Sequence, residues 1–374
     1  MRDKIIKFQA FLASPIHIGS GEYYEPFSYV IKNNKIYHFD TSVFLSKLPS
    51  EKIKQFTMIV KNPSFSKTLE ARKFIYENFD ISSMANIVFD EQDVSSSDFA
   101  NEYSEKLINL ASKDFNNKMI NMLEIEKTYS SGGYTVIPGS SIKGSIRTAI
   151  VNKIIEDNHI KYDPTRRDEY KKLMKEMNLS FTDDIFKILK VSDFSKSESV
   201  GKWIGYFHNY PKKSLEKSVS GELTVASEVI RPFQLFAGWL TIGDIPTHKY
   251  KRDVDNILES KQNLFKCLNR HYLELFKKDY NLFKEKSLNH NFVKIVDKQG
   301  LIDKLNENKY AVIRVGKHSG AEGVTFKERA IKIKENKRRQ AVHDAKEPTT
   351  VWYFSQKKIN NINSLYPMGW LILI

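Results

Sequence analysis

The sequence IPGSSIKGSIRTAI, residues 137–150, marks the point at which a strand turns into a helix. An extended segment ending at Val136 leads into a Pro-Gly turn, and two hydroxyl residues, Ser140 and Ser141, follow as candidate helix caps. Apolar residues then recur at helical spacing, at Ile142, Ile146, Ile150 and Ile154. We therefore predict a strand that turns directly into an amphipathic helix.

The front of this predicted helix is a candidate phosphate site. Its first backbone N–H groups have no partner within the helix, and the helix dipole places partial positive charge there. Lys143 and Arg147 are four residues apart and share one helix face. Gly139 and Gly144 would let a polymer backbone approach closely. The stretch is not a nucleotide-binding Walker loop, because its lysine precedes the second glycine instead of following it.

The composition predicts a globular protein with a polyanionic partner. The chain has 374 residues, of which 41% are hydrophobic, and this length suits two domains. Its net charge of +14 makes nucleic acid the expected partner. The charge is uneven, because residues 70–126 carry 12 acidic and 5 basic residues, a local net of −7. One acidic lobe on an otherwise basic chain is therefore expected.

The cysteine and histidine content argues against disulfide and metal sites. Cys267 is the only cysteine, and it lies in a helical pattern typical of a buried, inert thiol. The nine histidines form no His-x-x-x-His pair. We expect no cofactor and no metal. The N-terminus enters a strand pattern without a signal peptide, and no apolar run reaches membrane-spanning length, so we expect a cytoplasmic protein.

Strand and helix patterns along the chain predict an α+β fold of two small domains. A strand near residues 4–12 runs into a glycine turn and then a hairpin, and residues 41–130 form a polar, mostly helical insertion. Further strands are predicted at 189–194, 203–207, 223–230, 234–242, 351–354 and 370–374. A long amphipathic helix is predicted over residues 252–280.

Two more glycine-rich turns follow predicted strands and carry candidate ligands. Ser14–Gly21 contains His17, Gly19, Ser20 and Gly21, and lacks the third glycine of a dinucleotide-binding turn. Close approach by a phosphodiester is the better functional interpretation. Tyr310–Gly323 ends in a long turn that carries cationic side chains and glycine. Its candidate RNA-binding residues are Arg314, Lys317, His318 and Gly320.

Taken together, these motifs resemble a known family. The set is SPIHIGSG (14–21), IPGSSIKGSIR (137–147), VSD (191–193) and RVGKHSGAEG (314–323). It resembles the RAMP proteins of CRISPR systems, and most nearly the family of fifth subunits of type III-A Csm effector complexes. The likeness spans essentially the whole chain.

The resemblance implies a fold and a role. The fold would be two RRM-like, ferredoxin-like RAMP domains, at residues 1–200 and 201–374, with the acidic helical insertion at 41–130 inside the first. The protein would bind the 3′ portion of the guide RNA (crRNA) and cap a filament of Csm backbone RAMP subunits. It would support crRNA maturation in antiviral defence. The small helical Csm subunit and host nucleases are further expected partners, and no membrane is expected.

The resemblance also assigns residues to the RNA channel. From the middle motif these are Ser140, Ser141, Lys143, Gly144 and Arg147. From the last motif they are Arg314, Lys317, His318 and Gly320.

The resemblance further implies that this chain does not cut RNA. Related backbone subunits have a cleaving aspartate in the loop after the first glycine motif, whereas this loop reads Glu22-Tyr-Tyr-Glu25-Pro. RNA cleavage needs a group that activates the 2′-hydroxyl. The alternative is a metal-independent RAMP endoribonuclease that processes guide precursors. It would use His17 or His318 as general acid or base, beside Tyr23 or Lys143. A basic scaffold with no RNA role would leave the cations at two glycine turns unexplained.

Overall fold

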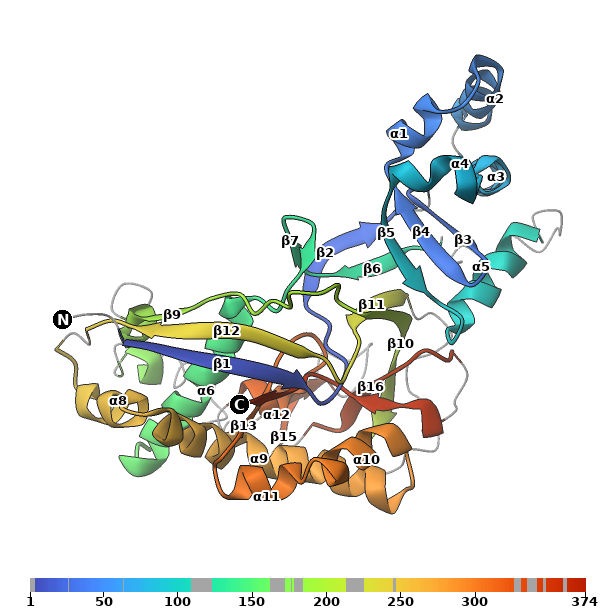
Figure 1. The fold of residues 1–374 in the computed structure, drawn as a ribbon. Coiled ribbons are helices and arrows are strands. Elements are labelled where there is room, and N and C mark those ends of the chain that lie inside the picture. The colour runs from blue at the N-terminus through green and yellow to red at the C-terminus, as the bar shows by residue number, and fades with distance from the viewer. Residues whose placement is uncertain are drawn as a thin grey trace.

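The computed structural model describes residues 4–25, 27–62, 64–108, 123–161, 172–175, 177, 184–212, 225–244, 247–325, 331–334, 342–345, 348–358 and 362–374. The fold is a mixed α+β arrangement with two large sheets, and a lobe projects from the body (Figure 1).

The strands of the larger sheets occupy every third of the chain. They are β1 (Lys4–Leu12), β2 (Gly19–Tyr24), β6 (Ile125–Thr128), β9 (Leu189–Val191), β10 (Lys202–Pro211), β11 (Ala226–Ile230), β12 (Leu235–Ile242), β13 (Ala311–Arg314), β16 (Thr350–Ser355), β17 (Tyr366–Pro367) and β18 (Trp370–Leu373). The smaller sheets contain β3 (Tyr29–Lys32), β4 (Lys35–Phe39), β5 (Val88–Asp93), β7 (Ser130–Ser131), β8 (Tyr134–Thr135), β14 (Ile331–Lys334) and β15 (Val342–Ala345).

The helices are unevenly distributed between the lobe and the body. The lobe and its base contain α1 (Thr41–Ser46), α2 (Ser50–Val60), α3 (Phe65–Asn78), α4 (Ile81–Met84) and α5 (Asp98–Ile108). The body contains α6 (Gly139–Asp157), α8 (Lys251–Leu258), α9 (Lys261–Glu285), α10 (His290–Lys298), α11 (Leu301–Asn306) and α12 (Ala321–Val324). Short 3-10 helices span Ala85–Ile87, Ile185–Ile188 and Ile362–Ser364.

The five-stranded sheet has the order β13-β18-β1-β12-β9, and its neighbouring strands are antiparallel. Side chains of β12 alternate between exposed and buried, so only one face of this strand enters the core. Helices α6, α8 and α9 lie on that side of β1 and β12 (Figure 1). This sheet and its helices form the largest hydrophobic core among the described residues.

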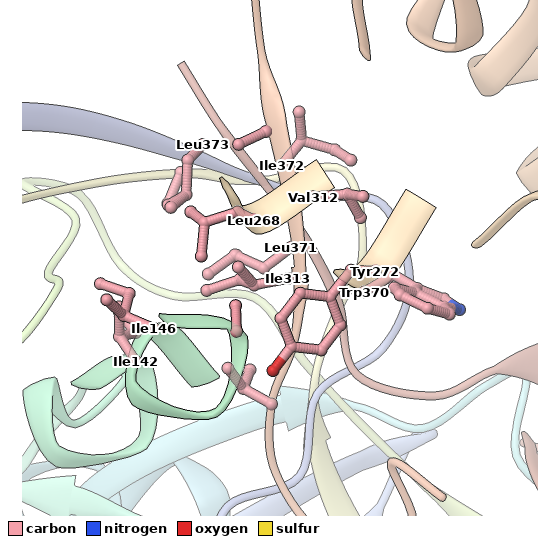
Figure 2. Close-up of a cluster of buried hydrophobic side chains, with 14 of the residues drawn as sticks. Ile142, Ile146, Leu268, Tyr272, Val312, Ile313, Trp370, Leu371, Ile372 and Leu373 are labelled. Carbon is pink, nitrogen blue, oxygen red and sulfur yellow. The ribbon is translucent and has the colours of Figure 1, made fainter. Parts of the chain in front are cut away.

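The centre of this core lies between α6, α9 and the chain's last strand. Ile142 and Ile146 of α6 meet Leu268 and Tyr272 of α9 against β13 and β18 (Figure 2). The isoleucine spacing predicted from the sequence is therefore the spacing of a buried helix face, and that prediction is confirmed. Cys267 is also buried, with a thiol pKa raised by burial to about 12, as expected of an inert thiol.

The long helix predicted at residues 252–280 is wrong as a single element. The structure has α8 and α9, separated by Glu259 and Ser260. Ser260 is extended, at φ −143°, and its hydroxyl accepts a hydrogen bond from the N–H of Asn263. A serine cap starts a new helix with its own direction, whereas the apolar spacing on either side continues almost unchanged.

The predicted helical insertion at 41–130 is also incomplete. Helices occupy much of it, and Phe74 and Phe79 are buried in the lobe as their spacing suggested. The sequence reasoning missed β5, which pairs with β4, and β6, which joins the six-stranded sheet in the order β17-β16-β10-β11-β6-β2. Each large sheet combines strands from before and after residue 200, so that position divides the sequence but neither sheet.

Within the described residues, no helix is both long and apolar enough to cross a membrane.

Candidate nucleic-acid interface

Three segments that are far apart in the sequence meet at one cleft of about 410 Å³. They are the start of β2, the first turns of α6 and the glycine-rich loop that follows β13. The lining residues are Ile18, Gly19, Ser141, Gly144, Ser145, Thr148, Arg314, Val315, Gly316, Lys317, Ser319, Gly323 and Val324. The three glycine motifs singled out in the sequence therefore each contribute to the same concave surface.

Hydrogen bonds hold the walls of this cleft together. The Ser145 hydroxyl donates to the carbonyl of Arg314 at 2.7 Å, which ties α6 to the end of β13. The Tyr272 hydroxyl lies within hydrogen-bond distance of the carbonyls of Ser145, at 3.1 Å, and Gly323, at 3.2 Å. Since these groups are buried, the two walls form one rigid unit supported by the core.

The glycine-rich loop lies directly on the first glycine motif. Gly316 has φ +88°, and a side chain there would collide with the carbonyl oxygen of His17. The N–H of Lys317 donates to that same carbonyl at 2.8 Å. Gly320 also has a positive φ, +78°. Glycine is therefore needed here for backbone geometry and for contact within the protein.

The two glycines of α6 have different roles. Gly144 has no atom within 4 Å of where a Cβ would lie, so it leaves open space at the cleft. A Cβ on Gly139 would instead collide with the carbonyl oxygen of Val191. The idea that Gly139 admits a polymer is therefore wrong, because β9 already occupies that space.

The front of α6 also differs from the prediction. The helix begins at Gly139, and no side chain caps it, so the expected capping by Ser140 and Ser141 is wrong. The N–H of Gly139 donates to the Asp193 carboxylate at 2.8 Å. The first anion at this helix end is thus a side chain of the protein itself. Asp193 belongs to the VSD motif, but its position in the sequence gave no indication of this contact.

The structure separates Lys143 and Arg147 from the lining of the cleft. Ser141, Gly144 and Thr148 face the cleft, and the two cations lie on the neighbouring face of α6. Arg147 Nε is 3.3 Å from Asp184 Oδ2, and partial burial lowers the pKa of Lys143. Ser140 is exposed at the helix start.

The cations of the glycine-rich loop are paired with carboxylates. Arg314 is 5% exposed; its Nε donates to the carbonyl of Met368 at 2.8 Å, and its guanidinium lies 3.4 Å from Asp279 and over the Trp370 ring. Lys317 donates to both oxygens of Glu126. Sequence reasoning counted the cations but missed these carboxylates, because no local pattern links them.

His17 is buried and structural. It has no exposed surface, and its Nδ1 donates to the carbonyl of Glu228 at 2.6 Å. Its Nε2 lies 3.6 Å from Glu126. Ser20 donates to the carbonyl of Lys127 at 3.3 Å, and Gly21 is exposed at φ +79°. Within the first motif, only Gly19 of the proposed ligands lines the cleft.

His318 lies beside the cleft in an aromatic cluster. Its ring centroid is 4.4 Å from that of Phe207 and 4.3 Å from that of Trp352. Burial, helped by the charge of Lys317, lowers the pKa of His318 to about 4. The ring is therefore neutral at pH 7, when it could accept a proton only weakly. Among the described residues, no three histidine, cysteine or acidic side chains gather as a metal site would require.

Comparison with known proteins gives a consistent result. The family model of the RAMP superfamily matches residues 12–341. A protein of Methanocaldococcus jannaschii named CRISPR system Cms protein Csm5 is 28% identical over 226 residues, which cover 56% of this chain and 48% of that protein. The chain thus spans about half the length of this curated relative.

Two solved structures share the fold. One is the cryo-EM structure of a Csm-crRNA-target RNA ternary complex of a type III-A CRISPR-Cas system. Its matching chain is 17% identical with a TM-score of 0.51, and the match covers 98% of this chain and 100% of that one. The other is the crystal structure of T. onnurineus Csm5, 13% identical with a TM-score of 0.50, covering 97% and 99%. At these identities the likeness is one of fold.

Proposed function

The chain belongs to the RAMP superfamily, and from that premise we propose that it is a non-catalytic crRNA-binding subunit of a type III-A CRISPR Csm effector complex. It would hold the 3′ portion of the guide, cap the row of Csm backbone subunits and support crRNA maturation in the cytoplasm. The small helical Csm subunit and host nucleases would be further partners. The observation that carries this proposal is the convergence of three glycine motifs on one cleft.

The cleft has the chemistry that a phosphodiester backbone needs. Gly19 and Gly144 leave the main chain uncovered, and a sugar-phosphate chain can therefore approach closely. Ser141 and Ser319 supply hydroxyl groups along the same surface. Lys317 supplies an ammonium group whose side chain is 43% exposed. Such contacts do not depend on base identity, as a guide-binding subunit requires.

The positions of the histidines favour binding over the alternative, a metal-independent endoribonuclease. A general acid or base must reach the 2′-hydroxyl or the leaving oxygen. His17 has no exposed surface, and the lowered pKa of His318 makes it a weak base at neutral pH. Tyr23 is 43% exposed, and Lys143 lies outside the cleft lining.

We also propose the domain organisation that the family implies. Two RRM-like RAMP domains, at 1–200 and 201–374, would each contribute to the body, with the lobe as an insertion in the first. Since both large sheets combine strands from the two segments, separate expression of residues 1–200 and 201–374 tests this division. Soluble complementation by the two fragments is expected, whereas independent folding of neither, even when mixed, would contradict it.

The proposed function is tested by altering Gly144 in the full-length protein. Binding of labelled single-stranded guide-type RNA is measured against salt concentration for wild type, Gly144→Glu and Gly144→Gln. The new side chains point into open space, so folding should be kept. We expect Gly144→Glu to weaken binding more than tenfold, and Gly144→Gln, of matched size without charge, to weaken it less.

Wild-type affinity should fall with salt, with a slope near −0.7 per phosphate neutralised. Affinity that does not change with salt, or equal binding by all three proteins, would contradict a phosphate-binding cleft. The same incubation is scored for RNA products with and without chelator. Metal-independent cleavage that is lost in His318→Ala would instead establish the nuclease.

A further inference from the structure

One face of the five-stranded sheet is uncovered over β1, β9 and β12. Its outward residues are Ile5, Lys7, Lys190, Leu235 and Trp239, which we call the open sheet face. Helices α6, α8 and α9 lie on the opposite side of these strands (Figure 1). The outward side chains therefore face solvent, although several of them are apolar.

Trp239 is the most unusual residue of this face. Its side chain is 51% exposed, whereas its strand neighbours Gly238 and Leu240 are buried. A half-exposed tryptophan on a rigid strand keeps a large aromatic surface available for a partner. Phe11 and Phe233 lie at the end of the same two strands, with their rings stacked at 20° and 6.4 Å between centroids. The face thus carries aromatic rings on well-defined backbone.

The charges on this face favour a polyanion. Lys7 lies directly opposite Trp239 in the register of β1 and β12, and Lys190 lies opposite Thr241. β1, β9 and β12 contain no aspartate or glutamate. Within the described residues, neither lysine forms an ion pair. Lysine is depleted in the centres of protein interfaces, whereas an aromatic ring beside unpaired cations is typical of single-stranded nucleic-acid binding.

The open sheet face also adjoins the candidate cleft. The N–H of Trp239 donates to the Ser192 hydroxyl at 2.9 Å, and the N–H of Ser192 donates to the carbonyl of Trp239 at 3.0 Å. The next residue, Asp193, accepts from the N–H of Gly139 at the start of α6. The helix that lines the cleft therefore begins next to this face.

We propose that the open sheet face is a second RNA-binding surface, on which bases of single-stranded RNA stack against Trp239 and backbone phosphates lie near Lys7 and Lys190. This inference rests on the proposed function, since it requires that the chain binds RNA. It adds base stacking to the backbone contacts of the cleft. Stacking is tolerant of sequence, because every base has a π-face.

The test compares two oligonucleotides on the full-length protein. One is single-stranded oligouridine, and the other is an abasic strand of the same length and charge. Trp239→Ala should weaken binding to oligouridine about tenfold, and leave binding to the abasic strand unchanged. Trp239→Phe should retain most of the affinity, because it keeps a ring. Ile5→Ala, a 59% exposed neighbour without a ring, is the matched control and should bind like wild type.

The outcomes separate this inference from the proposed function. If Gly144→Glu loses affinity and Trp239→Ala does not, the stacking surface is wrong and the cleft stands; the open face would then be a protein contact. An equal loss on both strands would also overturn stacking, because the abasic strand has no bases to stack. Wild-type protein that binds neither strand would refute the proposed function, and this inference with it.

Discussion

Lys317, in the glycine-rich loop, donates hydrogen bonds to both carboxylate oxygens of Glu126 on β6, at 2.6 and 2.8 Å. The pair joins the loop to the six-stranded sheet and neutralises the lysine that lines the cleft. The nearby His17 and the Lys317 ammonium lower the pKa of Glu126 to about 2. The carboxylate is therefore charged at every pH at which RNA binding would be measured.

Removing the charge of Glu126 should strengthen RNA binding. In Glu126→Gln the Lys317 ammonium becomes available to a phosphate, so we expect affinity for single-stranded RNA to rise severalfold and the salt slope to steepen by about 0.7. Glu274→Gln, on an exposed ion pair of α9, makes the same change in net charge and is the control. A loss of affinity in Glu126→Gln would show that the pair positions the loop instead of masking its charge.

The environment of His318 should make the protein less stable in mild acid. Its pKa is lowered from 6.5 to about 4. The unfolded chain therefore binds more protons between these values, and stability falls as the pH drops through them. We expect a loss of about 2 kcal/mol from pH 7 to pH 5 attributable to this group. Urea unfolding at both pH values checks it, and His318→Asn should lose this part of the pH dependence.

Alanine substitutions at the two glycines of α6 should have opposite effects. Gly139→Ala forces a Cβ against the Val191 carbonyl, so we expect a loss of roughly 2–3 kcal/mol in the free energy of unfolding. Gly144→Ala meets no atom within 4 Å and should stabilise the helix by about 0.5–1 kcal/mol. Thermal or urea unfolding of the two variants is the measurement. Equal effects would mean that α6 does not pack on β9 as described.

Arg314 should act on stability and not on phosphate binding. Arg314→Lys loses the bond to the Met368 carbonyl and the fit over Trp370, and we expect a loss of about 3 kcal/mol in the free energy of unfolding. At a temperature where the variant remains folded, its salt slope for RNA should equal that of wild type. A slope shallower by about 0.7 with unchanged stability would instead make Arg314 a phosphate ligand.

Local patterns predicted those parts of the fold that depend on neighbours in sequence. The isoleucine spacing of α6, the hairpin of β3 and β4 and the alternation of β12 follow from helix and strand geometry, and the structure confirms them. The division of α8 from α9 at Ser260 was missed, because one capping hydroxyl redirects the chain without breaking the apolar pattern. β5 and β6 were missed within a polar region whose partners lie elsewhere in the chain.

The sequence by itself determined the superfamily, the basic character of the chain and the three glycine motifs of the candidate site, because these are properties of residue type and order. The tertiary structure decided which of these residues meet. It placed Gly19, Gly144 and Lys317 on one cleft, buried His17, and moved Lys143 and Arg147 to the neighbouring face of α6. It also brought carboxylates to the cations from distant segments. Charge in a sequence is a count, whereas charge at a site depends on distance, which only folding sets.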